Sequence, residues 1–157
     1  MSIGESMSEL HDLYKKLGNE GYGEAIGKKA PYFSTIRPEF LELRPGFCEI
    51  LIRNEPSVHN HIGTIHAIAI CNGAELVAGV TTDISIPEEH RWIPVGMTVK
   101  YLAKAKTDIR VVAKGENIDW AIVGNIIVPV EAYNATDVKV LTGEITMRVG
   151  KKKLGRQ

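Results

Sequence analysis

The most apolar stretch of the chain runs from residue 64 to residue 79, and its apolar positions fall on nearly every side of a helix. Glu75 is the one acidic or basic residue within it apart from a histidine. A helix that is apolar all round is normally buried, whereas an ionised carboxylate is costly to bury unless it is paired, hydrogen-bonded or retained for chemistry. We therefore predict a buried helix from Thr64 to Gly79 that carries a functional acid.

Alternating apolar and polar positions predict strands on both sides of this helix. Upstream, residues 33–43, bent by Pro38, and residues 47–53 are expected to form a hairpin across the turn at Pro45-Gly46. Downstream, further strands are expected over residues 91–102, 107–114, 120–133 and 138–149. An antiparallel sheet that curls around an apolar helix buries it, so this order of elements predicts an α+β fold.

Two short helical segments precede the hairpin. The first begins at Ser8, a favourable N-cap, and stops at Gly18, whereas the second covers residues 20–30 and ends at Pro31. We interpret residues 1–157 as one domain with a core at about 33–149, a helical extension at 1–30 and a basic tail at 150–157.

Composition excludes several classes of function. Lys+Arg and Asp+Glu each number 19 in 157 residues, so the net charge is zero and gives no general attraction to nucleic acid. Two distant cysteines, Cys48 and Cys71, indicate neither a disulfide framework nor a zinc site. A zinc site built from His59, His61 and His66 lacks the usual helical spacing. With no signal peptide or membrane span expected, we predict a cytoplasmic protein.

A polar segment leads into the apolar helix. It reads Asn60-His61-Ile62-Gly63-Thr64-Ile65-His66-Ala67, and Glu75 follows nine residues after His66. Together with Pro45-Gly46, these residues resemble the hotdog-fold thioesterase superfamily, most closely its phenylacetyl-CoA thioesterase-like branch. The resemblance covers about residues 33–149, and it implies a hotdog fold, in which a curved antiparallel sheet wraps one long central helix.

The resemblance also implies roles for individual residues. Glu75 matches the acid that acts as nucleophile or general base toward the thioester, and the backbone N–H of Ala67 matches the group that polarises the thioester carbonyl. Asn60 matches the amide that orients water or the acyl group, and the ring of His66 is expected to cap or orient the helix start. We expect the substrate to be bound by Gly63, Thr64, Asn72 and Gly79. No metal or organic cofactor is required.

The spacing of Ala67 and Glu75 indicates a dimer. Eight helical residues span about 12 Å, so one protomer does not easily place both groups on one carbonyl. Two antiparallel copies of the helix do so, with Ala67 of one chain facing Glu75 of the other. We therefore expect a homodimer, or a dimer of dimers, that hydrolyses acyl-CoA to a free acid and coenzyme A.

Two other functions fit the same fold. A hydratase or dehydratase uses a histidine and an acid about fourteen residues apart, a spacing that His61 and Glu75 satisfy, although the other sequence pieces of those enzymes are absent. A dimer that binds acyl-CoA without turning it over, or that is only structural, is the other alternative. Ala67 where the family more often has glycine, and Gly79 where some members have a hydroxyl, favour that alternative. Fold alone does not decide among these functions.

Overall fold

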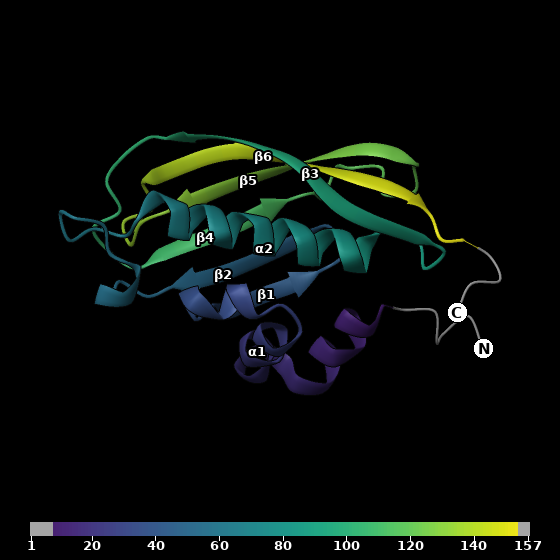
Figure 1. The fold of residues 1–157 in the computed structure, drawn as a ribbon, viewed down its shortest axis with the longest axis horizontal. Coiled ribbons are helices and arrows are strands. Elements are labelled where there is room, and N and C mark those ends of the chain that lie inside the picture. The colour runs from purple at the N-terminus through teal and green to yellow at the C-terminus, as the bar shows by residue number, and fades with distance from the viewer. Residues whose placement is uncertain (1–7, 154–157) are drawn as a thin grey trace.

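A curved sheet wrapped around a long helix dominates the computed structural model, which describes residues 8–153 (Figure 1). The helices are α1 (Glu9–Lys29), the 3-10 helices η2 (Pro31–Ile36) and η3 (Pro56–Val58), and α2 (Ala67–Ser85). The strands are β1 (Glu39–Arg44), β2 (Phe47–Ile52), β3 (His90–Tyr101), β4 (Ile109–Lys114), β5 (Gly124–Tyr133) and β6 (Lys139–Lys151). The predicted α+β class is confirmed.

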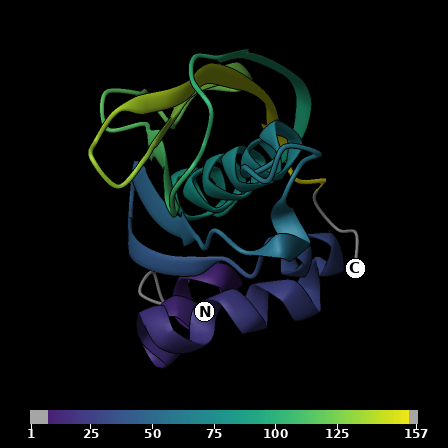
Figure 2. The same ribbon diagram turned by 90° about the vertical axis from the view of Figure 1, so that its left-hand side faces the viewer.

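The six strands form one antiparallel sheet in the order β1-β2-β4-β5-β6-β3. Viewed end on, the sheet curls around α2 (Figure 2). Its inner face is apolar: Cys48, Ile50 and Ile52 of β2 are fully buried and alternate with half-buried residues, as the sequence pattern predicts. Burying one such aliphatic side chain contributes about 1.5–3 kcal/mol, so packing of the sheet on α2 dominates the stability of the domain.

Helix α1 lies outside this arrangement and packs against β1. The hydroxyl of Ser8 caps its N-terminus by accepting the N–H of His11, and Gly18 breaks it with a φ of 67°, so the two predicted helical segments are confirmed. A Cβ at Gly23 would lie 2.1 Å from the carbonyl oxygen of Pro38. The helix therefore approaches the sheet as closely as its backbone allows.

The predicted limits of the central helix are wrong at both ends. It begins at Ala67 rather than Thr64, because the N–H of Ile65 is bonded to the carbonyl of Ala105 across the loop. It continues to Ser85 rather than ending at Gly79. A Cβ at Gly79 would lie 3.0 Å from the ring of Trp92, so this glycine permits close packing and does not stop the helix.

Two predicted strands also start later than expected. Residues 31–36 form η2, in which Ser34 and Thr35 hydroxyls donate to the carbonyls of Pro31 and Tyr32, so β1 starts only at Glu39. Residues 120–123 belong to a turn in which the indole N–H of Trp120 donates to the carbonyl of Gly115. These local hydrogen bonds replace strand pairing.

Helix α2 is the one helix among residues 8–153 whose length and apolar character would suffice to cross a membrane. Within the protein, 67% of that segment is buried. Its apolar surface is thus accounted for by the protein core.

A cluster of charges on the outer side of the sheet links three strands. Glu131 of β5 forms ion pairs with Lys114 of β4 and Lys139 of β6, and accepts a hydrogen bond from the hydroxyl of Tyr133 at 2.9 Å. Partial burial by itself raises the pKa of Glu131, but the bonds from these three residues outweigh it and lower that pKa to about 2. The folded state therefore favours ionised Glu131.

We expect the free energy of unfolding to fall as the pH drops from about 4.5, the ordinary pKa of the carboxyl, toward 2. Across this range the unfolded state binds a proton that the folded state does not, so folding is penalised as the pH decreases. In Glu131→Gln this contribution to the pH dependence disappears. Urea unfolding at a series of pH values measures it. The control is Glu144→Gln, which changes an exposed carboxylate that forms no ion pair with any residue from 8 to 153. Equal pH slopes in the wild type and Glu131→Gln would contradict the expectation.

Candidate active site

A closed turn precedes α2 and fixes three of the predicted site residues. The side-chain oxygen of Asn60 accepts the backbone N–H groups of Ile62 and Thr64 at 3.1 Å, and its amide donates to Thr64 Oγ1 at 2.8 Å. Gly63 has a φ of 81°, which glycine adopts without strain, and its N–H donates to the carbonyl of Asn60. The hydrogen bonds of Asn60 thus hold the turn itself.

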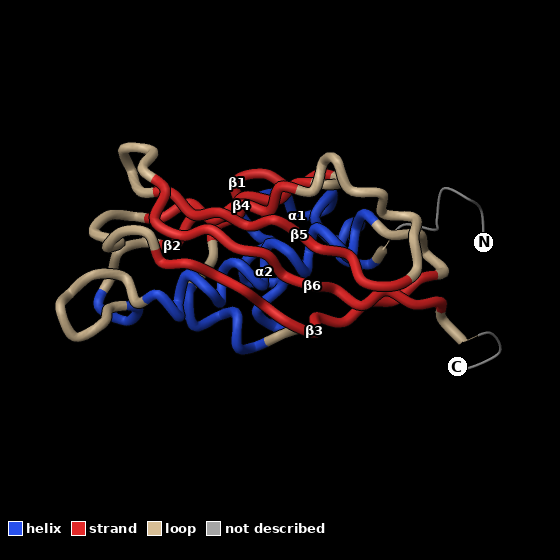
Figure 3. Tube along the Cα trace, turned by 90° about the horizontal axis from the view of Figure 1, so that it is seen from above, coloured by secondary structure: helices blue, strands red, loops and turns tan. Residues whose placement is uncertain are grey.

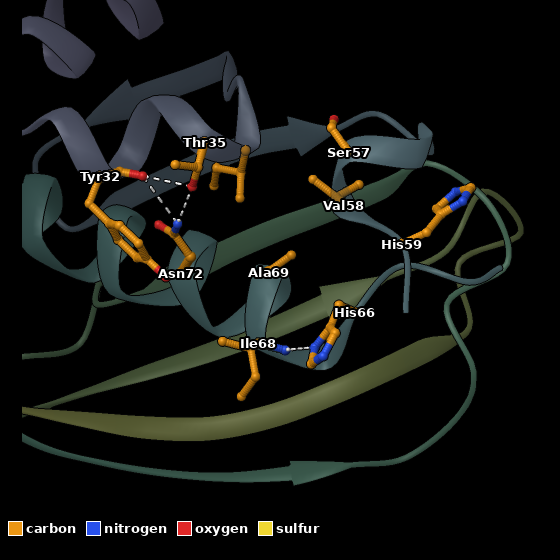
Figure 4. Close-up of a pocket in the computed structure, with 10 residues that line it drawn as sticks. Tyr32, Thr35, Ser57, Val58, His59, His66, Ile68, Ala69 and Asn72 are labelled. Atoms are coloured by element: carbon orange, nitrogen blue, oxygen red, sulfur yellow. Dashed lines mark hydrogen bonds between the residues drawn. The ribbon is translucent and has the colours of Figure 1, made fainter. Parts of the chain in front are cut away.

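His66 caps the start of α2, as predicted. Its Nδ1 accepts the N–H of Ile68 at 3.1 Å, which requires a neutral ring with its proton on Nε2 (Figure 4). Its carbonyl accepts the N–H groups of Ala69 and Ile70. Within residues 8–153 the N–H of Ala67 has no acceptor, so the first turn of α2 leaves one donor free at the positive end of the helix dipole.

Glu75 lies in the middle of α2 and is half-buried, less enclosed than its sequence surroundings predict. It makes no hydrogen bond or ion pair with any residue from 8 to 153. It lines an almost wholly apolar cavity of about 300 Å³, together with Gly79 one turn later on the helix. The carboxylate is therefore available to a ligand.

Trp92 of β3 lines this cavity beside Gly79. Its ring lies over the glycine, and its indole N–H donates to the carboxylate of Asp83 at 2.8 Å. The sequence indicates only that Trp92 is a core or interface residue, since nothing in the spacing relates it to Glu75. The other wall of the cavity comes from α1 and η2. No pattern in the sequence relates these two elements to Glu75.

Ala67 lines a different cavity, of about 280 Å³, with Asn60 and Thr64. Tyr101, at the end of β3, borders this cavity, just as Trp92 near the start of β3 borders the cavity of Glu75. Eight residues separate Ala67 from Glu75 on the helix, about 12 Å. A single chain thus presents Ala67 and Glu75 in two separate cavities, which border opposite ends of β3.

Asn72 and His66 line a third cavity, of about 350 Å³, shown in Figure 4. The amide of Asn72 donates to Thr35 Oγ1 at 3.2 Å and to the carbonyl of Tyr32 at 3.5 Å, while its buried oxygen has no partner within the described residues. The eight predicted site residues therefore divide among three cavities, except Gly63, which is exposed on its turn. His61 is likewise exposed and shares none of these cavities with Glu75.

We expect Asn60→Ala to lower the free energy of unfolding by about 1–3 kcal/mol, because two backbone N–H groups lose their acceptor. Asn60→Asp keeps that acceptor and loses only the donor to Thr64, so its effect should be smaller. Chemical denaturation of the three proteins measures the difference. If Asn60 acted on a bound water alone, both variants would be as stable as the wild type.

Comparison with known proteins places this geometry in a family. The family model described as Domain of unknown function (DUF4442) matches residues 18–149. The crystal structure of the genomics protein APC5556 is 53% identical, with a TM-score of 0.85 over 93% of this chain and 99% of that chain. A comparison with curated proteins gives no match.

More distant structures share the fold. A thioesterase family protein from Silicibacter pomeroyi is 16% identical, with a TM-score of 0.71 over 86% of this chain and 100% of that chain. The protein PA5026 from Pseudomonas aeruginosa, described as of unknown function and a probable thioesterase, is 18% identical, with a TM-score of 0.75 over 88% and 96% of the two chains. The chain therefore belongs to the family described as Domain of unknown function (DUF4442), and it has the hotdog fold that its sequence motifs predict, a fold that it shares with these two structures.

Proposed function

We propose that this protein is a thioesterase that hydrolyses an acyl-CoA to a free acid and coenzyme A. One observation carries the proposal: among residues 8–153 the backbone N–H of Ala67 has no acceptor and the carboxylate of Glu75, beside an apolar cavity, has no partner. A free N–H at a helix start suits a developing oxyanion. An unpaired carboxylate suits the activation of water or attack on a carbonyl.

In the proposed reaction the thioester carbonyl accepts the Ala67 N–H. Glu75 either removes a proton from the attacking water or attacks the carbonyl itself to give an anhydride that water then cleaves. In both routes the carbon–sulfur bond breaks, water supplies the new oxygen of the acid, and a proton reaches the departing thiolate of coenzyme A. No step requires a metal or a redox cofactor.

We further propose that the active enzyme is a homodimer joined along β3. This strand is one of the two edge strands of the sheet (Figure 3), and several of its apolar side chains are exposed, namely Ile93 at 61%, Val95 at 56% and Tyr101 at 56%. An open, apolar edge strand favours pairing with a second copy. A twofold axis at this edge would set the two α2 helices antiparallel. The cavities of Ala67 and Glu75 both border β3. In such a dimer the Ala67 cavity of one protomer would therefore adjoin the Glu75 cavity of its partner.

A second candidate is an acyl-CoA-binding protein without turnover. The observation in its favour is that the amide of Asn60 is engaged within its own turn and so is poorly placed to hold a catalytic water. The resemblance to the phenylacetyl-CoA thioesterase-like branch suggests an aromatic acyl group, but it does not distinguish an enzyme from a binding protein. The same experiments address both candidates.

Glu75→Gln should lower kcat by about 10²-fold or more, because the neutral amide neither accepts a proton nor attacks a carbonyl. The assay is thiol release from short, long and aromatic acyl-CoAs, with the size of the assembly checked by light scattering. Glu89→Gln, which changes an exposed carboxylate beyond the end of α2, is the matched control. Equal turnover by Glu75→Gln and wild type would assign the chemistry elsewhere, and binding without turnover by the wild type would favour the second candidate.

Ala67→Pro tests the backbone donor directly. Ala67 is the first residue of α2, where proline is well tolerated, and His66 has the extended φ and ψ of −61° and 133° that a residue before proline favours. The substitution removes the N–H that the first turn of α2 leaves without an acceptor among residues 8–153, so we expect kcat to fall about 10²–10³-fold with little change in melting temperature.

Ala67→Gly, which keeps the N–H, is the control for this experiment and should remain active. A fully active proline variant would show that the N–H of Ala67 does not bind the oxyanion.

A further inference from the structure

The cavity beside Glu75 has one wall that does not belong to the sheet and its central helix. Gly79 and Trp92 provide the wall from the core, while Leu10 and Ile26 of α1 and Phe33 of η2 provide the opposite one. The segment from Glu9 to Ile36 therefore closes a space that the sheet and α2 alone would leave open.

Charge is kept away from the interior of this cavity. The other ionisable residue that lines it is Lys29, whose ammonium group lies 3.9 Å from the carboxylate of Glu9 and is solvent-exposed. The aliphatic stem of Lys29 thus contributes to the lining while its charge points outward. Glu75 is left as the polar group of an apolar space, which fits a ligand with one reactive polar group and an apolar body.

The wall is held rigidly against the core. The ring of Tyr22 packs edge to face on Phe40 of β1 at 4.7 Å, and its hydroxyl donates to the carbonyl of Leu10 at 2.8 Å. The side-chain amide of Asn19 donates to the carbonyl of Leu41 at 2.9 Å. Leu10 is thereby fixed relative to the sheet, so its side chain sets a definite boundary.

The other cavities along α2 are less suited to an apolar group. The lining of the Asn72 cavity includes the polar residues Thr35, His59 and His66, and Asn60, Thr64 and Lys104 lie among the apolar residues that line the cavity of Ala67. An alkyl or aryl group placed in either would cover polar groups that water otherwise solvates. The hydrophobic effect therefore directs such a group to the cavity of Glu75.

We infer that α1 and η2 form the end wall of the acyl pocket and that Leu10 and Phe33 set the length of acyl group accepted. This inference rests on the proposed thioesterase function and adds the class of substrate. The cavity holds about 300 Å³, and a methylene group is close in size to a water molecule, about 30 Å³. The preferred substrate is therefore an alkyl or aryl acyl-CoA with an acyl group on the order of ten carbon atoms.

The test changes the wall and measures the preference for chain length. Thiol release is followed for straight-chain acyl-CoAs from butanoyl to tetradecanoyl, and for phenylacetyl-CoA, with wild type, Leu10→Ala, Phe33→Ala and Leu10→Phe. Leu13→Ala is the matched control, because Leu13 lies on the same helix and packs on the core without lining the cavity. Circular dichroism checks that each variant is folded.

We expect the two alanine variants to favour longer chains and Leu10→Phe to favour shorter ones. Each buried methylene is worth about fourfold in affinity, so the two extra methylenes of dodecanoyl-CoA should raise its kcat/KM relative to decanoyl-CoA by about fifteenfold in Leu10→Ala. Leu13→Ala should keep the wild-type order of substrates. Hydrolysis with the same order of substrates in every variant would overturn the inference and leave the thioesterase proposal intact.

A binding measurement separates the two proposals if no hydrolysis is seen. Decanoyl-CoA and dodecanoyl-CoA are titrated calorimetrically into Glu75→Gln and into Glu75→Gln with Leu10→Ala. A rise in the relative affinity for dodecanoyl-CoA in the double variant supports the wall even without turnover. Equal relative affinities in the two proteins, or the absence of binding, overturn it.

Discussion

Helix α2 is apolar around nearly its whole circumference, and the fold depends on removing that surface from water. The sheet achieves this by curving, with the inner faces of β2, β4, β5 and β6 lined by fully buried side chains such as Ile50, Val111, Val130 and Met147. Close approach requires small residues on the helix, and Gly79 under the ring of Trp92 is one of them. The curvature of the sheet and the small residues of α2 thus both serve to pack the helix closely against the sheet.

Burial of α2 is incomplete along β3, and the candidate site lies there. The free N–H of Ala67 and the unpaired carboxylate of Glu75 are each less buried than the neighbouring core residues, and each borders a cavity that reaches β3. The same strand is the open edge of the sheet. The N–H of Ala67 and the carboxylate of Glu75 are tolerated because the sheet ends at β3 and does not bury them. A second copy or a ligand that binds at β3 would therefore contact these two polar groups. The position of the edge strand thus also decides where the candidate site lies.

The N-terminal extension adds a second layer to this plan. Helix α1 buries Tyr22 and Ile26 against the core, and through Leu10 it also reaches the cavity of Glu75. A segment outside the sheet can vary in length and side chains without disturbing the wrapping of α2. It is therefore a suitable part of the chain in which to encode the proposed preference for an acyl group, while the helix and sheet keep the candidate site residues in place.

The sequence by itself determined the apolar central helix, the order of strands, the break at Gly18 and the cap at His66, because each depends on periodicity or on a local backbone hydrogen bond. It also singled out Ala67 and Glu75, whose spacing on one helix is independent of the rest of the fold. Only the tertiary structure decided that Gly79 continues the helix beneath Trp92 and that Leu10 and Phe33 lie beside Glu75. Those outcomes depend on contacts between segments distant in the chain, and no local pattern of residues records such contacts.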